Sequence, residues 1–178
     1  MDIELTTDVI HRLLTIRLAT KVDLPALEWE GEYSHFRLLY ADVYKTTQEG
    51  HGLIWIAELP EKAGLIGQLF VSLKGGRVEL ADGIGRAYIF GFRVRPEYRN
   101  LGIGKRIMSV VEQDLTERGY RWVTLNVGKE NPAAQRFYER LGYRVIAEEP
   151  GRWSYIDDKH RRRDVFEPAW RMEKKIGR

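Results

Sequence analysis

The sequence predicts an α/β domain of α+β character, with a mixed, mostly antiparallel sheet of about seven strands flanked by helices. Leu53–Glu58 and Leu65–Leu73 are two β-type runs joined by a turn containing Pro and Gly, which is typical of an antiparallel hairpin. Further on, a strand at Ala87–Val94, a helix at Ile103–Arg118 and a strand at Trp122–Val127 require a right-handed crossover between parallel neighbours. Both kinds of pairing in one chain predict a mixed sheet.

The elements before the hairpin follow from periodicity. Leu14–Ala19 alternates apolar and polar residues and predicts an opening strand. Asp23, followed by a leucine and a proline, marks the start of a short helix near Leu24–Glu28. Ser34–Thr47 carries apolar residues at helical spacing, which predicts a longer helix.

The second half of the chain has clear helix boundaries. Gly119 ends the helix predicted from Ile103, and Asn131 with the following proline opens another helix through Leu141. Val145–Glu148 and Ala169–Glu173 are predicted closing strands. No repeat or linker interrupts this order, so we expect a single domain over residues 1–178.

The composition excludes several classes of protein. Of the 178 residues 31% are charged and 43% are hydrophobic, which is typical neither of a disordered chain nor of a membrane protein. No apolar run approaches the roughly 20 residues of a spanning helix, and the N-terminus has no signal-peptide pattern. The absence of cysteine excludes disulfides and thiolate chemistry and fits a cytoplasmic location. The net charge of +3 is a mild bias toward anionic partners.

The stretch VRPEYRNLGIGKRIM, between the strand at Ala87–Val94 and the next helix, has the features of an anion site. The first N–H groups of a helix have no intrahelical partner, and the helix dipole adds partial positive charge there. Gly102 and Gly104 permit close approach to the backbone, while Arg99 and Lys105 add full charges. The junction fits a phosphate or pyrophosphate; the alternative is that both glycines only shape a tight turn.

Two common phosphate-binding patterns do not match here. The Walker pattern needs Gly and Ser or Thr where this chain has Arg99 and Arg106. The dinucleotide pattern G-x-G-x-x-G needs a third glycine at Ile107. Neither pattern therefore identifies the junction as a phosphate site.

Two motifs resemble those of the GNAT superfamily, the acyl-CoA-dependent N-acetyltransferases. Arg99–Gly104 matches that family's pyrophosphate pattern [RQ]-x-x-G-x-[GA]. Asn131–Tyr143, NPAAQRFYERLGY, is similar to its signature N-x-x-A-x-x-x-Y-x-x-x-G-[FY]. One helix and one strand are predicted between the motifs, as the family's fold demands, and the clear similarity covers about Ile89–Val145.

The resemblance implies acetyl-CoA as cosubstrate. Backbone amides from Leu101 to Lys105, with Arg99, would hold the pyrophosphate, and the strand edge at Phe92–Val94 would hydrogen-bond the pantetheine arm. The thioester would lie in a gap between two splayed parallel strands, and Asn131, which could also be only a helix cap, would contact the pantetheine. The cofactor-binding residues implied are Phe92, Arg93, Val94, Arg99, Asn100, Leu101, Gly102, Ile103, Gly104, Lys105, Asn131 and Tyr138.

The resemblance also implies two catalytic residues. Tyr138 would donate a proton to the departing CoA thiolate, although its spacing alone fits the apolar face of a helix. Many relatives carry Glu or Asp on the strand before the pyrophosphate loop, but AYIFGFRV has neither. Glu58 is the predicted substitute, as a base acting directly or through water. The alternatives are that Glu58 is a solvated carboxylate and that no dedicated base exists.

The acceptor pocket is expected where the family places its early helices and late strands. Ordinary packing would explain the same aromatic side chains equally well. The residues expected to line this pocket are Trp29, Tyr33, Phe36 and Trp153. Three glutamates, Glu28, Glu30 and Glu32, would attract a cationic amine. The histidines are scattered, so no metal site is predicted.

The predicted function is an N-acetyltransferase that moves acetyl from acetyl-CoA to a primary amine by direct attack in a ternary complex. The acceptor, a small-molecule or peptide amine, stays open among a protein N-terminus, lysine, polyamine, aminoglycoside or small metabolite. Transfer of another acyl group, CoA sensing, or RNA binding through Lys159–Arg163 are the alternatives. We expect that basic run to be the solvated tip of a hairpin, and hence no nucleic-acid or membrane partner; the chain is expected to be a monomer or homodimer.

Overall fold

The computed structural model describes residues 6–178, which form one seven-stranded sheet and a separate two-stranded hairpin. The strands are β1 (Thr15–Leu18), β2 (Gly52–Leu59), β3 (Gly64–Ser72), β4 (Arg86–Val94), β5 (Trp122–Gly128), β6 (Arg144–Glu149), β7 (Arg152–Ile156), β8 (Arg162–Phe166) and β9 (Ala169–Lys175). The order in the sheet is β1-β2-β3-β4-β5-β9-β6. Only β4 and β5 pair in parallel, so the predicted mixed, mostly antiparallel sheet is confirmed.

The helices lie close to where periodicity predicts them, with one addition at the N-terminus. They are α1 (Thr7–Leu13), η1 (Lys21–Gly31), η2 (Ser34–Phe36), α2 (Arg37–Gln48), η3 (Glu61–Ala63), η4 (Pro96–Tyr98), α3 (Ile103–Glu117) and α4 (Pro132–Arg140), the η elements being 3-10 helices. The helix predicted near Leu24–Glu28 is longer and kinked, because Trp29 and Glu30 have φ of 47° and 55°. Helix α1 was not predicted.

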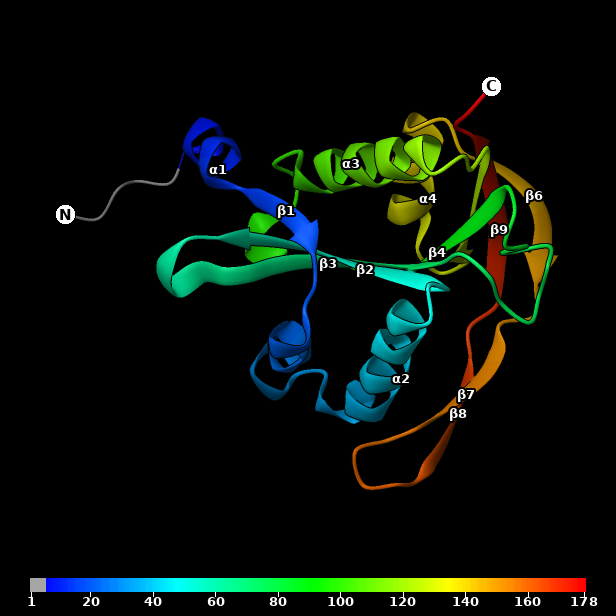
Figure 1. Ribbon diagram of the computed structural model, residues 1–178, viewed down its shortest axis with the longest axis horizontal. Coiled ribbons are helices and arrows are strands. Elements are labelled where there is room, and N and C mark those ends of the chain that lie inside the picture. Colours follow the sequence, from blue (N-terminus) through cyan, green and yellow to red (C-terminus); the bar gives the residue numbers. More distant parts are fainter. Residues whose placement is uncertain (1–5) are drawn as a thin grey trace.

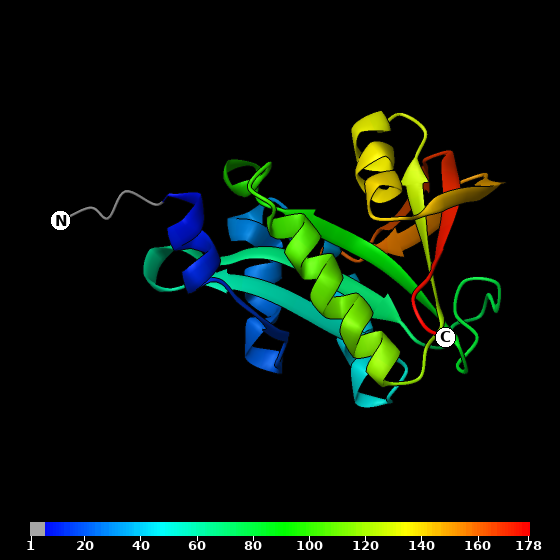
Figure 2. The same ribbon diagram turned by 90° about the horizontal axis from the view of Figure 1, so that it is seen from above.

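The helices cover both faces of the sheet. Figure 1 shows α3 and α4 on one face and η1 and α2 on the other, and Figure 2 shows α3 lying along the strands of the first half of the sheet. The two faces bury separate apolar clusters. The buried residues of α3 recur at helical spacing, which explains why this helix packs with one face on the sheet: Ile103, Ile107, Met108, Val111 and Leu115.

The two parallel strands separate halfway along β4. Their pairing runs from Arg86 opposite Trp122 to Ile89 opposite Leu125, and the rest of β4 has no partner on that side. On its other side β4 pairs with β3 and carries a bulge. Gln68 pairs with Arg93 and Phe70 pairs with Phe90, so β4 has one residue more than β3 between these two pairs. At the bulge Gly91 has φ of 61°, and a Cβ there would lie 2.5 Å from the ring of Phe70. The separation opens a gap in the sheet, with a backbone edge that lacks strand partners.

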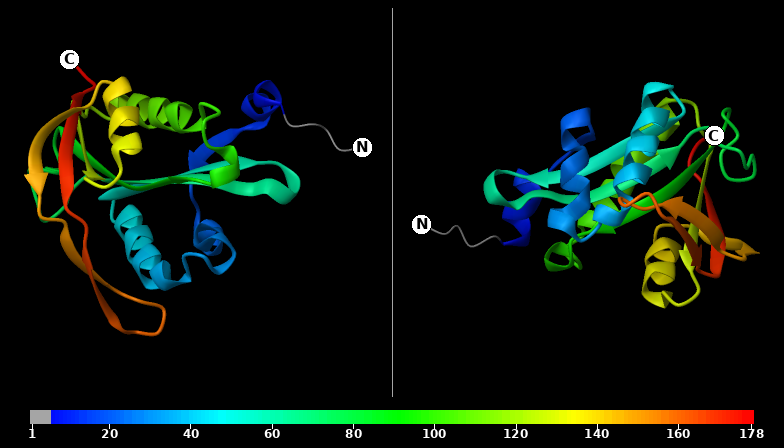
Figure 3. Two further views of the ribbon diagram at one scale, coloured as in Figure 1. Left: turned by 180° about the vertical axis from the view of Figure 1, so that it is seen from behind. Right: turned by 90° about the horizontal axis from the view of Figure 1, so that it is seen from below.

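The late hairpin bends away from the main sheet toward α2 (Figures 1 and 3). Trp153 and Tyr155 of β7 pack against Phe36, with ring centroids 6.3 and 4.9 Å away. The basic run forms the hairpin tip and the start of β8, and Arg161 and Arg163 both form ion pairs with Asp157, whose side chain is 3% exposed. Burial would raise the pKa of Asp157, but hydrogen bonds from the backbone N–H of Arg161 and from Arg163 outweigh it and hold the pKa well below its usual range.

Within residues 6–178, none of the helices combines the length and the apolar character needed to cross a bilayer.

Candidate active site

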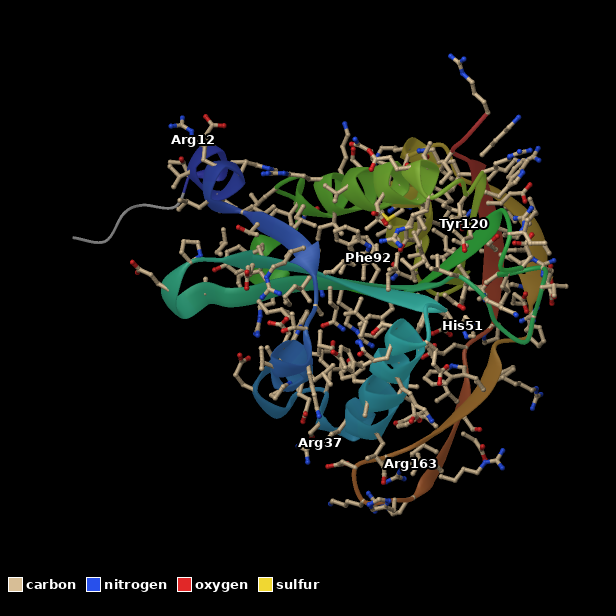
Figure 4. The ribbon with its side chains drawn as sticks, in the orientation of Figure 1. Arg12, Arg37, His51, Phe92, Tyr120 and Arg163 are labelled. Carbon is tan, nitrogen blue, oxygen red and sulfur yellow. The ribbon has the colours of Figure 1, made fainter. Side chains whose placement is uncertain are left out.

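A cleft of about 700 Å³ lies at the end of β4, between the start of α3 and one side of α4. Nine of the predicted cofactor residues line it: Phe92, Arg93, Val94, Arg99, Asn100, Gly102, Gly104, Lys105 and Tyr138. The residues that motif matching missed are Tyr98, Ala133, Ala134, Arg136, Phe137, Arg140 and Leu141. Figure 4 shows Phe92 between α3 and the sheet. The structure thus brings both sequence motifs together in one cleft.

The charge of the cleft has a single sign. Five basic residues line it, and none of the lining residues is Asp or Glu: Arg93, whose guanidinium lies over the ring of Tyr33, and Arg99, Lys105, Arg136 and Arg140. The Nε atom of Arg99 donates to the carbonyl oxygen of Val94 at 2.8 Å, which holds its guanidinium at the end of β4. The last four of these cations together with the first N–H groups of α3 form a place for a strongly anionic ligand.

The two glycines of the junction have different local roles. Gly102 caps α3 with φ of 79°, a conformation that side-chain-bearing residues rarely adopt. Gly104 has an ordinary φ, but a Cβ there would lie 3.3 Å from Phe137 and 3.5 Å from Phe92. Gly102 therefore shapes the turn that leads into α3. Gly104 lets Phe137 of α4 come close to α3 at the floor of the cleft.

The N-terminal helix α1 contacts the glycine junction from outside the cleft. The Nε2 atom of His11 lies 2.6 Å from the carbonyl oxygen of Leu101, and the guanidinium of Arg106 donates to the carbonyl oxygen of His11. Two hydrogen bonds therefore join α1 to the loop and to the first turn of α3. Sequence reasoning missed this contact, because nothing in the local pattern relates His11 to a residue 90 positions away.

Tyr138 lies on α4 beside the cleft. Asn131 caps this helix, since its side chain accepts a hydrogen bond from the N–H of Ala134 at 3.1 Å. The ring of Tyr138 packs edge-on against Phe137 and Tyr143, with centroids 5.2 and 5.8 Å away. Burial raises the pKa of Tyr138 well above its usual value, so the hydroxyl keeps its proton at neutral pH. Such a group can donate a proton but is a poor base.

Two polar side chains lie where β4 and β5 separate. Asn126 of β5 is the first residue beyond the paired segment, and its Nδ2 donates to the hydroxyl of Tyr88 at 3.4 Å. The Oδ1 of Asn126 is buried and has no hydrogen-bond partner in the described part of the chain. Burial raises the pKa of Tyr88. The alternation of polar and apolar residues on both strands was the available signal for this pair.

Glu58 does not line the cleft. Its Oε1 accepts from Nε of Arg17 at 2.8 Å, and the same guanidinium binds Asp23 at 2.9 Å. Hydrogen bonds from Arg17 lower the pKa of Asp23 to about 2. Strand β3 lies between β2, which carries Glu58, and β4. The carboxylate therefore helps to hold η1 against the edge of the sheet.

The four predicted acceptor residues lie in one aromatic cluster, in which Trp29 packs edge-on against Tyr33 with centroids 5.2 Å apart. Tyr33 and Phe36 stack with centroids 6.3 Å apart, and Trp153 lies 6.3 Å from Phe36. Trp29 is only 3% exposed, and its Nε1 donates to Oε1 of Gln68 at 3.2 Å. The packing interpretation therefore accounts for Trp29, while Trp153 is 40% exposed and accessible to a ligand.

A metal site is not visible around this cleft: among residues 6–178, no group of three or more His, Asp or Glu side chains could hold an ion.

Residues 20–143 match the sequence model of the Acetyltransferase (GNAT) family. The chain therefore belongs to the GNAT family of acetyltransferases.

Three curated relatives are N-acetyl- or acetyltransferases. The 5-NmdU N-acetyltransferase of Pseudomonas phage PaMx11 is 40% identical over 58 residues, 33% of this chain and 39% of that protein. The mycothiol acetyltransferase of Nocardiopsis dassonvillei is 38% identical over 66 residues, covering 36% and 19% of the two chains. N-acetyltransferase family 8 member 2 of Rattus norvegicus is 28% identical over 104 residues, covering 58% and 43%. The matches span less than half of each relative.

Solved structures share the fold over most of the chain. The ribosomal-protein-S18-alanine N-acetyltransferase of Escherichia coli has a TM-score of 0.68 at 20% identity, with 93% of this chain and 95% of that chain covered. The spermidine/spermine N-acetyltransferase SpeG of Vibrio cholerae has a TM-score of 0.69 at 17% identity, with 94% and 95% covered. At such identities the likeness shows the fold alone.

Proposed function

We propose that this protein transfers the acetyl group of acetyl-CoA to a primary amine by direct attack in a ternary complex. The observation that carries the proposal is a cation-lined cleft at the start of α3 that meets the gap between β4 and β5. The family assignment supports acetyl-CoA as the donor.

The cleft fits the chemistry of the nucleotide thioester. The first N–H groups of α3 and Lys105 would bind the pyrophosphate, and Arg99, Arg136 and Arg140 would supplement the charge. Beyond Ile89, β4 has no strand partner on the side that faces β5, so backbone groups from Phe92 to Val94 can pair there with the amides of the pantetheine arm. The proposed role of Asn131 as a pantetheine contact is compatible with its observed role as a helix cap.

The reaction needs alignment more than covalent help, because a thioester is already activated. The amine nitrogen forms a bond to the acetyl carbon and the carbon–sulfur bond breaks. The ammonium substrate loses two protons in all: one is released to solvent, and the other is balanced by the proton that CoA gains. We propose that Tyr138 delivers this proton to the sulfur and is reprotonated from solvent.

The residue that removes the proton from the amine is proposed separately from the proton donor. Glu58 is held by Arg17 and lies two strands from the gap, so we do not assign it proton abstraction. We propose that water in the gap, beside Asn126 and Tyr88, takes the proton of the amine. This corresponds to the case without a dedicated base.

The decisive test combines binding and turnover. Acetyl-CoA at saturating concentration should raise the melting temperature, because it binds the folded state alone. A free-thiol assay with a panel of primary amines should then detect CoA release that depends on the amine. No melting shift with acetyl-CoA or CoA would contradict the proposal, and a shift without amine-dependent thiol release would favour a CoA sensor.

A further inference from the structure

Arg93 connects the cofactor cleft with the opposite face of the sheet. Arg93 is one of the residues that line the cleft. Its guanidinium, however, lies over the ring of Tyr33, 4.1 Å from the ring centroid, and 5.4 Å from the ring centroid of Phe36. Its Nη1 donates to the hydroxyl of Tyr40 at 3.0 Å. No carboxylate in residues 6–178 forms an ion pair with it. Arg93 is thus a half-buried cation held in position by aromatic rings and a neutral hydroxyl.

Two acidic groups on the same side form ion pairs with arginines. Glu28 pairs with Arg37 at 2.7 Å, and Glu30 pairs with Arg95 at 2.8 Å. Two of the three glutamates expected to attract a cation are therefore occupied. The wall formed by Tyr33, Phe36 and Tyr40 carries the positive charge of Arg93, and of the three glutamates only Glu32 has no ion pair within residues 6–178.

A series of aromatic rings leads from Arg93 to the gap. Tyr40 packs on Phe70 with centroids 5.5 Å apart, Phe70 on Phe90 at 5.5 Å, and Phe90 on Tyr88 at 5.6 Å. Tyr88 touches Asn126, whose buried Oδ1 lacks a partner in the described chain. The series of rings thus has the guanidinium of Arg93 at one end and the Oδ1 of Asn126, a hydrogen-bond acceptor beside the gap, at the other end.

These two ends match complementary parts of one molecule. A planar guanidinium binds carboxylate or phosphate oxygens through two parallel hydrogen bonds, and stacking on Tyr33 fixes its plane. An unpaired carbonyl oxygen such as that of Asn126 is suited to accept from the N–H of an amine. A purely cationic polyamine would be repelled by Arg93.

We propose that the acceptor is a small primary amine that also carries an anionic group, a carboxylate or a phosphate, which Arg93 binds. The proposal rests on the acetyl transfer proposed above and adds the acceptor class. The amine nitrogen reaches the acetyl carbon through the gap beside Asn126, and its protons leave as in the general reaction. Arg93 binds the acceptor and takes no part in the proton transfers.

The first test measures kcat/KM for matched pairs of amines. Tyrosine is compared with tyramine for the carboxylate, and phosphoethanolamine with ethanolamine for the phosphate. We expect the anionic member of at least one pair to be preferred by roughly 10- to 100-fold, the range of a charge-assisted hydrogen bond. The pair with the larger ratio identifies which anion is bound. Equal rates within both pairs, or faster turnover of spermidine or of an amidated peptide, would overturn the proposal.

The second test replaces Arg93. Arg93→Met should bring the ratio within the preferred pair to about one, through a higher KM for the anionic amine and an unchanged KM for acetyl-CoA, since the expected cofactor contact is through the backbone. Arg93→Lys keeps the charge without the planar fork and should retain a reduced preference. A ratio unchanged in both variants would contradict the role of Arg93.

Arg37→Met is the matched control. Arg37 points away from the sheet (Figure 4), and its charge is compensated by Glu28, so the ratio should stay at the wild-type value. Acetyl-CoA-induced stabilisation is measured for every variant. A wild-type protein that binds acetyl-CoA and acetylates amines without preference contradicts the acceptor class alone, whereas a wild-type protein that does not bind acetyl-CoA contradicts the proposed function.

Discussion

The two faces of the sheet build their halves of the site in different ways. The cleft beside α3 and α4 relies on backbone geometry, namely a helix N-terminus and an unpaired strand edge, and four cations there face no carboxylate. The opposite wall beside η1, η2 and α2 relies on side chains, with Glu28 and Glu30 paired to arginines and Arg93 stacked on rings. A site built from backbone groups leaves a local sequence motif, whereas a wall made of side chains depends on which charged groups find partners in the folded chain.

The gap joins both halves, so disrupting it should have the largest effect. Gly91→Val would force a branched side chain into φ of 61° and against the ring of Phe70. We expect a loss of about 3 kcal/mol or more in the free energy of unfolding, measured by chemical denaturation. Gly85→Ala is the control, because a Cβ there meets nothing within 4 Å. Equal stability of the two variants would show that the bulge tolerates a side chain.

Loss of the proposed proton donor should lower kcat without changing the affinity for acetyl-CoA. Tyr138→Phe should lower kcat by about 100-fold, the lower range for a general acid, and leave the Kd of acetyl-CoA unchanged. Because burial raises the pKa of Tyr138, the hydroxyl should not produce an alkaline decline of kcat below about pH 10. Unchanged kcat would indicate that Tyr138 only packs in the core.

The contact of α1 with the glycine junction gives a smaller, selective effect. His11→Phe keeps the ring shape but removes the hydrogen bond to Leu101, so we expect a rise of about five-fold in the KM for acetyl-CoA with kcat and the amine KM unchanged. His11→Gln can restore a donor and should recover part of the loss. A parallel change in kcat would indicate that α1 acts on the reaction centre and not on the cofactor loop.

Glu58 should matter least. Glu58→Gln keeps a hydrogen-bond acceptor for Arg17, and the partly exposed ion pair contributes about 0–1 kcal/mol. We expect kcat/KM within about threefold of the wild type and an unshifted pH profile. A loss of 100-fold together with a shifted acidic limb would instead restore Glu58 as the base.

Many features could be predicted because their signals are local. The helix at Ile103, the hairpin of β2 and β3, and the two motifs follow from periodicity, turn residues and spacing. The bulge at Gly91 and helix α1 could not be predicted, since both depend on contacts with distant partners. The same holds for Trp29, which hydrogen bonds to Gln68 in the core.

The sequence by itself determined the order of the strands and helices apart from α1, and the junction from Arg99 to Lys105 for which we propose anion binding, because short-range sterics and unpaired backbone groups decide both. Only the tertiary structure decided which charges stay uncompensated. Glu58 and Glu30 found arginine partners from distant segments, while Arg93 found aromatic rings. Such pairing depends on which side chains folding brings within a few ångströms of each other, and linear spacing carries no record of that distance.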